Sequence, residues 1–149
     1  MAMTTATNLE TLNSLLRGEM SALETYRQAI ETLDDANAPG ATELHSLRRA
    51  HRDAADALWH HIDGHGEKPS ETSGAWGTFA QAVTGTAKLF GNTAALKALK
   101  EGEEHGVKDY EAALKDEHLP AECKNLIQGQ LLPKQREHVS AIDRLMERQ

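Results

Sequence analysis

The chain has 149 residues, a length that fits one domain with its own core, and 39% hydrophobic with 26% charged residues exclude a disordered chain. The formal net charge of −7 excludes the basic surface typical of nucleic-acid-binding proteins, so we expect no nucleic-acid partner. No apolar stretch approaches the roughly 20 residues that span a bilayer, so we expect no membrane partner.

Apolar residues recur every three or four positions along residues 8–35, which predicts a long first helix after a disordered N-terminus at residues 1–7. A second helix is predicted from residue 41 or 42 to residue 63, where Gly64-His65-Gly66 ends it. Both helices carry one apolar face and one polar face. We therefore expect them to pack against each other.

The second half of the chain predicts a similar pair of helices, at residues 93–116 and 120–149. Pro133 lies inside the last helix and cannot donate a backbone hydrogen bond, so we expect a kink there. Residues 76–90 between the pairs keep a helical period despite two glycines, and predict a shorter packing helix, or two. The pattern favours a single all-α domain over residues 8–149: an antiparallel four-helix bundle with an extra helix in the crossover between its second and third helices.

Two glutamates interrupt the apolar faces of the first and third long helices. Glu19 occupies a position that the apolar repeat skips, and Glu103 does the same in its helix. A tyrosine follows each glutamate seven residues later, at Tyr26 and Tyr110, and seven residues make about two helical turns. Because an unpaired buried carboxylate is very costly, each must be neutral, hydrogen-bonded, paired with a cation or bound to a metal ion.

The other two long helices carry polar residues on their apolar faces, His51 in the second and Gln135 with His138 in the last. Each half of the chain thus has a Glu/Tyr helix followed by a helix with a histidine on its apolar face, which indicates a weak internal duplication. A glutamate on two helices and an acid/His pair on the other two is the arrangement of di-iron carboxylate bundles.

With these motifs the sequence resembles the ferritin-like superfamily, and most closely a small bacterial family of ferritin-like domains of unknown function. The resemblance rests on three stretches: Leu-Leu-Arg-Gly-Glu19 through Tyr26, Glu101-Gly-Glu103-Glu104 through Tyr110, and Gln135-Arg-Glu-His138. It covers nearly the whole chain after residue 8. It implies a ferritin-like bundle and a metal site in its core.

The chain departs from the ferritin-like oxidases, which place Glu-x-x-His on their second and fourth helices. Gln135 stands where the last helix would carry a glutamate. The second helix has no such motif: one alignment puts His51 at the glutamate position and Ala54 at the histidine position, and another puts Arg48 before His51. At least one ligand is lost in either case. The resemblance therefore implies one divalent ion of iron, manganese or zinc more readily than two irons.

Three interpretations of the two glutamates stay open. The first is a single metal ion, the second a metal-free buried hydrogen-bond network with tyrosine, histidine and glutamine, and the third partial exposure. An oxidase with two irons is the least favoured function, we expect no catalytic residues, and a non-catalytic bundle acting by self-association or partner docking is as well favoured as metal binding. The candidate metal ligands are Glu19, His51, Glu103, Gln135 and His138, with Tyr26 and Tyr110 around them.

The remaining histidines and the cysteine give weaker indications of function. His60, His61 and His65 crowd the end of the second helix, where cationic side chains favour the negative helix end. Cys123 is the single cysteine, so no internal disulfide can form, which fits a reducing cytoplasmic compartment, and its apolar neighbours predict a buried structural role. Residues 1–8 lack the basic and apolar regions of a signal peptide. We also expect a homo-oligomer, most simply a dimer.

Overall fold

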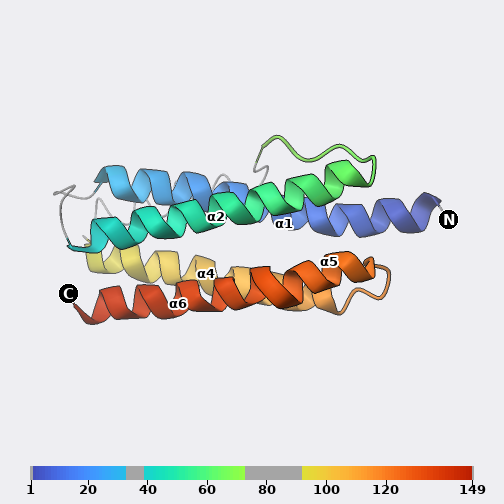
Figure 1. Cartoon of the computed structure of the whole chain (residues 1–149). Coiled ribbons are helices and arrows are strands. Elements are labelled where there is room, and N and C mark those ends of the chain that lie inside the picture. Colours follow the sequence, from blue (N-terminus) through green and yellow to red (C-terminus); the bar gives the residue numbers. More distant parts are fainter. Residues whose placement is uncertain (1, 33–38, 73–91, 149) are drawn as a thin grey trace.

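The computed structural model describes residues 2–32, 39–72 and 92–148. Its elements are α1 (Ala2–Thr32), α2 (Pro39–Gly64), α4 (Asn92–Leu114) and a continuous helical stretch made of α5 (Ala121–Leu126), η2 (Ile127–Leu131) and α6 (Leu132–Glu147). No β-strand occurs in the described residues, which confirms the all-α prediction. These four helical stretches of the described residues lie side by side (Figure 1).

The helix boundaries agree with the sequence predictions to within about three residues, except at the start of α1. That helix begins at Ala2, before the predicted start at residue 8, in a segment without glycine or proline to interrupt it. The predicted end of the first helix and the predicted crossover helix at residues 76–90 lie outside the described residues.

Near Pro133, where a kink was predicted, the structure has a π-helical turn immediately before the proline. Within η2 the backbone hydrogen bonds span five residues, as from the Leu132 N–H to the Ile127 carbonyl, and Pro133 then lies in the first turn of α6. The wide turn absorbs the missing donor of Pro133 without breaking the helix. It also keeps both Cys123 before it and Gln135 after it on the buried face.

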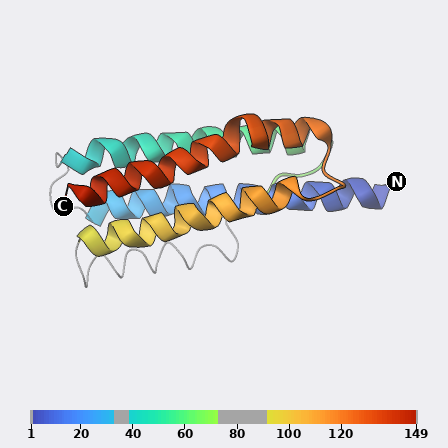
Figure 2. The ribbon, with the colours of Figure 1, turned by 90° about the horizontal axis from the view of Figure 1, so that it is seen from below.

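The helices pack in two pairs, α1 with α2 and α4 with the stretch that ends in α6 (Figure 1). A view turned by 90° shows that α1 also lies beside α4, and α2 beside α6 (Figure 2). The four stretches therefore surround one shared interior. Within the described part of the chain, none of the helices combines the length and the apolar character that crossing a membrane requires.

Two apolar clusters fill this interior. The first includes Leu12, Leu16, Leu58, Ile62, Cys123 and Ile127. The second includes Tyr26, Leu44, Leu47, Leu99, Ile142 and Leu145. On each of the four helical stretches the change from one cluster to the other falls at a buried polar residue, and the residues at this boundary are Glu19, His51, Glu103, Gln135 and His138.

Candidate metal centre in the helical core

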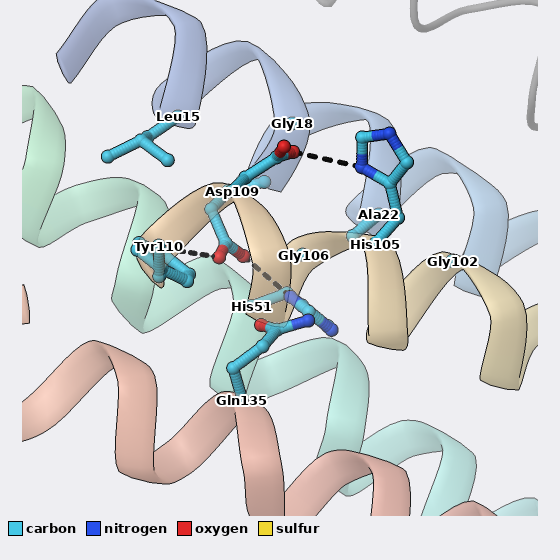
Figure 3. A pocket seen from close by; sticks show the side chains of 11 residues that line it. Leu15, Gly18, Ala22, His51, Gly102, His105, Gly106, Asp109, Tyr110 and Gln135 are labelled. Atoms are coloured by element: carbon cyan, nitrogen blue, oxygen red, sulfur yellow. Dashed lines mark hydrogen bonds and ion pairs between the residues drawn. The ribbon is translucent and has the colours of Figure 1, made fainter. Parts of the chain in front are cut away.

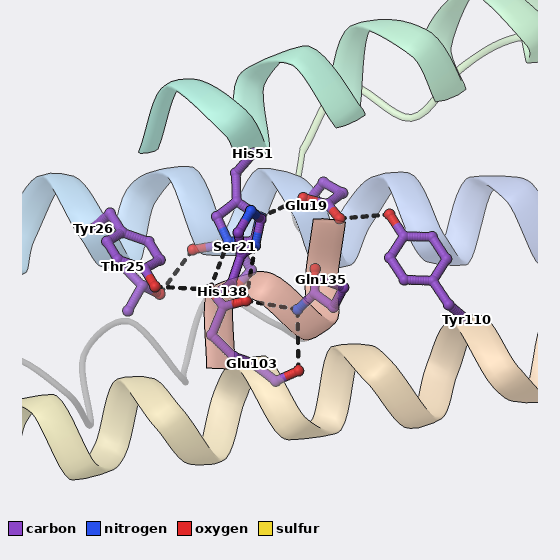
Figure 4. Close-up of polar contacts among 9 residues, drawn as sticks. All are labelled: Glu19, Ser21, Thr25, Tyr26, His51, Glu103, Tyr110, Gln135 and His138. Carbon is purple, nitrogen blue, oxygen red and sulfur yellow. Dashed lines mark hydrogen bonds and ion pairs between the residues drawn. The ribbon is translucent and has the colours of Figure 1, made fainter. Parts of the chain in front are cut away.

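His51 lies at the middle of the polar layer and bridges the two buried glutamates. Its Nδ1 atom is 2.6 Å from Oε2 of Glu19, and its Nε2 atom is 2.6 Å from Oε1 of Glu103. The three side chains come from α2, α1 and α4, and each is at most 5% exposed. Figure 4 shows the imidazole held between the two carboxylates. With a proton on both nitrogens, His51 donates to both carboxylates.

The two tyrosines support the glutamates from opposite helices. The Tyr110 hydroxyl of α4 donates to Oε1 of Glu19 in α1 at 2.5 Å, and the Tyr26 hydroxyl of α1 donates to Oε1 of Glu103 in α4 at 2.7 Å (Figure 4). The tyrosine of each helix therefore bonds to the glutamate of the other helix. These two tyrosine–glutamate hydrogen bonds fix the register of α1 against α4.

The last helix completes the layer around Glu103. The Gln135 amide donates to Oε2 of Glu103 at 2.7 Å and to the Glu103 backbone carbonyl at 3.0 Å, and Nδ1 of His138 lies 3.2 Å from the same Oε2. The His138 ring also lies 4.7 Å from the His51 ring, measured between centroids. Its Nε2 atom is buried and has no hydrogen-bond partner. A buried imidazole nitrogen without a partner is uncommon and calls for an explanation.

The electrostatics of the layer follow from this geometry. Burial alone lowers the pKa of His51, but the charges of Glu103 and Glu19 and their hydrogen bonds outweigh it and raise that pKa to about 10. Burial raises the pKa of Glu103, but the charge of His51 and the hydrogen bonds from His138 and His51 lower it to about 2. Burial, reinforced by the nearby carboxylates, raises the pKa of Tyr26 and Tyr110 well above the usual value, so both remain donors.

A constant offset along the chain relates the two halves of the site. The same number of residues separates Glu19 from Glu103, Tyr26 from Tyr110, and His51 from Gln135. By this offset Gln135 is the counterpart of His51, and Ala54 is the counterpart of His138. The two halves therefore differ at two positions of the polar layer, where His51 corresponds to Gln135 and Ala54 to His138.

Gly106 is a further member of the site, which the sequence did not single out. A Cβ atom at this position would lie closer than 3.0 Å to the amide nitrogen of Gln135. The glycine lets the Gln135 amide reach the backbone carbonyl of Glu103, one turn earlier on α4. Its cost in the middle of a helix, about 1 kcal/mol relative to alanine, was the only signal in the sequence.

Two cavities reach the polar layer. One of about 50 Å³ is lined on α1 by Gly18 and Ala22 and on α4 by Gly102 and Gly106, and it reaches Glu19 and His51 (Figure 3). A larger one of about 340 Å³ lies between α2 and the last helical stretch and reaches Glu19, Ala54 and His138, among other lining residues. Water or a small ion therefore has routes to the layer from two sides.

The structure brings together all seven residues singled out in the sequence, five as candidate ligands and two as their supports. Partial exposure of the glutamates is wrong, because Glu19 is 5% and Glu103 3% exposed. Three of the seven, His51, Glu103 and His138, each offer a ligand atom within 4.8 Å of the other two. Glu19 is not in that group, although its Oε2 atom lies 2.6 Å from Nδ1 of His51.

Comparison of the sequence with known proteins identifies the family to which the chain is similar. A family model described as domain of unknown function (DUF2383) matches residues 7–116, which include most of α1 and all of α2 and α4. Neither the curated proteins nor the solved structures contain a match to the chain. The matched segment contains Glu19, His51 and Glu103, and it ends before Gln135 and His138.

Proposed function

The chain belongs to the family of the domain of unknown function DUF2383, and we propose from its core that it binds one divalent transition-metal ion. The ligands in this proposal are Nε2 of His51, the Glu103 carboxylate and an imidazole nitrogen of His138. The observation that carries it is the convergence of these three side chains in the core, with one nitrogen of His138 lacking any hydrogen-bond partner. Two imidazoles and a carboxylate suit iron(II), manganese or zinc.

Glu19 supports the proposed ion indirectly. Metal-binding histidines generally donate their other N–H group to a carboxylate, which fixes the tautomer and the ring orientation. The 2.6 Å contact between Nδ1 of His51 and Glu19 has this form, and it leaves Nε2 to face Glu103. Tyr110 in turn orients Glu19, and Gln135 orients Glu103. In this proposal Glu19 and Gln135 position the ligands and do not themselves bind the ion.

The charge count favours one ion over two. With one divalent ion and a neutral His51, the two carboxylates balance the charge of the buried layer. Two divalent ions would leave two uncompensated positive charges in a site where burial makes each very costly. The positions that would supply bridging carboxylates hold His51 and Gln135. The layer therefore does not fit a di-iron centre. A single ion would supply Lewis acidity, and three protein ligands would leave it an open coordination position.

We also propose that the helices form an antiparallel, ferritin-like bundle. The exchanged contacts of Glu19 with Tyr110 and of Tyr26 with Glu103 support this arrangement. When two helices run antiparallel, residues seven positions apart on one meet residues seven positions apart on the other in reverse order. A parallel pair would match like with like, glutamate against glutamate.

The proposal is tested by the metal content of the purified protein and by titration of the chelator-treated protein with iron(II), manganese(II) and zinc(II). We expect one ion per chain in the core, with affinity reduced at least about tenfold in Glu103→Gln and His138→Ala. Glu104→Gln and His45→Ala are matched controls, because both residues are exposed on the same helices as the ligands. Core variants that bind each ion as tightly as these controls would overturn the proposal.

A metal-free core is the second candidate, and the two 2.6 Å contacts of His51 favour it. In that form a proton on each nitrogen of His51 joins the two carboxylates, and the domain is a non-catalytic bundle that acts by self-association or partner docking. Nitrogen-15 NMR of the imidazole distinguishes the two: a doubly protonated His51 that persists with each metal ion in excess supports the metal-free form. Loss of one proton when metal is added supports the metal site.

Gln135→Glu separates the two candidates by the sign of its effect. The substitution replaces an amide donor with a second carboxylate beside Glu103, so without metal we expect a less stable protein under both candidates. A metal ion bound at this place would gain a ligand from the new carboxylate. We therefore expect added metal to raise the melting temperature of this variant more than that of the unsubstituted chain. An equal response would favour the metal-free core.

Dimer formation is a separate proposal. Trp59 on α2 supports it, because its side chain is 41% exposed and large apolar side chains are enriched at protein interfaces. Light scattering over a range of protein concentrations tests it. A monomer at every concentration would contradict it, and a dimer that Trp59→Lys dissociates would support it.

A further inference from the structure

A second cluster of metal-binding side chains lies far along α2 from the core site. It contains His61 in the last turn of α2, His65 just after that helix, and Glu122 and Cys123 in the first turn of α5. The Cys123 sulfur is 3.9 Å from Nδ1 of His61 and 4.0 Å from Nε2 of His65, and this Nε2 is 2.8 Å from Oε1 of Glu122. One ligand atom from each side chain lies within 4.8 Å of the other three.

The local backbone explains why these side chains meet. His61 and His65 are four residues apart, so their side chains leave the same face of the helix. Gly66 then adopts a φ of +82°, and the N–H of Glu67 bonds to the carbonyl of Ile62 at 3.3 Å, which closes the turn containing His65 directly after the helix ends at Gly64. On the other side the N–H of Cys123 bonds to the carbonyl of Pro120 at 3.0 Å, which starts α5.

The spacing of the cluster is close to that of a tetrahedral zinc site. Zinc binds sulfur at about 2.3 Å and nitrogen at about 2.0–2.1 Å, and tetrahedral angles then put sulfur and nitrogen about 3.6 Å apart. The two observed distances, 3.9 and 4.0 Å, exceed this by a few tenths of an ångström. Small side-chain rotations would close the difference, because only Cys123 among the four is fully buried.

We propose that His61, His65, Glu122 and Cys123 form a zinc site that joins the end of α2 to the start of α5. A thiolate and two imidazoles are a donor set that selects zinc over the harder divalent ions, and a carboxylate completes the fourth position. The thiolate and the Glu122 carboxylate balance the two charges of the ion. The site shares no residue with the core layer and does not depend on the proposed core ion.

The site joins segments of the chain that are distant in sequence. The contacts from Cys123 span 62 residues to His61 and 58 residues to His65. The bound ion would therefore tie the first pair of helices to the last stretch at this end of the bundle. A cross-link between such distant segments stabilises the folded form, because the ion binds only when both are in place.

Cobalt(II) is the probe that tests the proposal, because a cobalt–thiolate bond gives a charge-transfer band in the near ultraviolet. The core layer contains no sulfur, so cobalt bound there gives no such band, and the two proposals can fail independently. We expect the reduced, full-length chain to develop the band with one equivalent of cobalt, and one equivalent of zinc to remove it by displacement. A chain that develops no band would overturn the proposal.

The variants assign the ligands. Cys123→Ser is expected to abolish the charge-transfer band, and His65→Ala and His61→Ala to weaken zinc binding at least about tenfold. His60→Ala is the matched control, because His60 is exposed on the same turn of α2 and is not in the cluster. His65→Ala keeps the test decisive even if Cys123→Ser perturbs folding, because His65 lies on the surface. Zinc affinity in His65→Ala equal to that in His60→Ala would overturn the assignment.

Discussion

The core layer and the cluster at the end of α2 contain similar side chains but differ in how their donors are satisfied. In the core, both nitrogens of His51 contact carboxylates at 2.6 Å. At the end of α2, the cysteine meets its two histidines at 3.9 and 4.0 Å, and the Glu122 side chain is 61% exposed. The core groups compensate one another before any ion binds, whereas at the end of α2 the buried thiol has only long contacts and the pair of His65 with Glu122 lies partly in solvent.

Because of this difference, the core residues should affect mainly the stability of the folded chain, and the residues at the end of α2 mainly the affinity for a metal ion. A metal ion on Nε2 of His51 must replace the proton that this nitrogen shares with Glu103, so the core site competes with its own hydrogen bonds. An ion at the end of α2 replaces the long contacts of Cys123 and the partly exposed ion pair of His65 with Glu122. Loss of His51 should therefore destabilise the core even without metal, whereas loss of His65 should lower only the metal affinity at the end of α2.

The largest expected effect comes from comparing His51→Ala with His65→Ala in the presence of a chelator. Removing His51 leaves Glu19 and Glu103 buried without their shared cation, and breaking a buried pair in this way costs about 3–5 kcal/mol. Removing His65 takes away a surface contact and is expected to change the free energy of unfolding by less than about 0.5 kcal/mol. Urea denaturation measures both.

His45→Ala is the control for His51→Ala, since His45 is exposed on the same helix. The comparison would fail if His51→Ala cost no more than His65→Ala. That result would mean that the two glutamates take up protons in the variant without a large penalty.

The pH dependence of stability gives the next largest effect. The pKa of His51 is raised from 6.5 to about 10 in the folded chain, so its contribution is full below pH 6.5 and disappears as the pH rises to 10. Without metal, the free energy of unfolding should fall by about 1 kcal/mol per unit between pH 7 and pH 9. Denaturation at both pH values checks this, and the fall should be absent in His51→Ala and retained in His65→Ala. A fall of equal size in His51→Ala would assign it to other groups.

Much of the fold was predictable because the apolar residues repeat over many turns. The periodicity located the helices to within a few residues, and the gaps at Glu19 and Glu103 identified the buried polar layer. The π turn at η2 was not predicted, although three successive spacings of four residues lead from Cys123 to Gln135 on the buried face. Such a run is too long for regular α turns and indicates a wider one.

The partners of the polar residues were less predictable than their burial. The sequence showed that Tyr26 shares a face with Glu19, but the structure pairs Tyr26 with Glu103 on the other helix. The proximity of Cys123 to His61 could not be foreseen, because it depends on how the last stretch packs against α2. Apolar patterns determine which face of a helix is buried, and they carry little information on which polar groups then meet.

Tyr110→Phe and Tyr26→Phe test whether the two tyrosine–glutamate hydrogen bonds of the core stabilise the chain equally. Tyr110 is the donor to Oε1 of Glu19, whereas Oε1 of Glu103 accepts from both Tyr26 and His51. We expect Tyr110→Phe to destabilise the chain by about 2 kcal/mol and Tyr26→Phe by about 1 kcal/mol, since only the first leaves a carboxylate oxygen without its hydrogen bond. Thermal denaturation of both variants checks the order. Equal losses would mean that a water molecule replaces Tyr110.

Gly106→Ala and Gly18→Ala give the smallest effects, and they should differ in sign. Both glycines line the small cavity beside the core, and alanine in a helix is favoured over glycine by about 1 kcal/mol. A Cβ atom at Gly18 meets nothing within 4 Å, so Gly18→Ala should stabilise the chain by up to that amount. At Gly106 the Cβ atom displaces the Gln135 amide from Glu103, and the lost hydrogen bonds should turn the gain into a net loss of about 1 kcal/mol. Urea denaturation with a chelator measures both changes. A gain at both positions would show that Gln135 can move without cost, and that the Glu103 carboxylate does not depend on its amide.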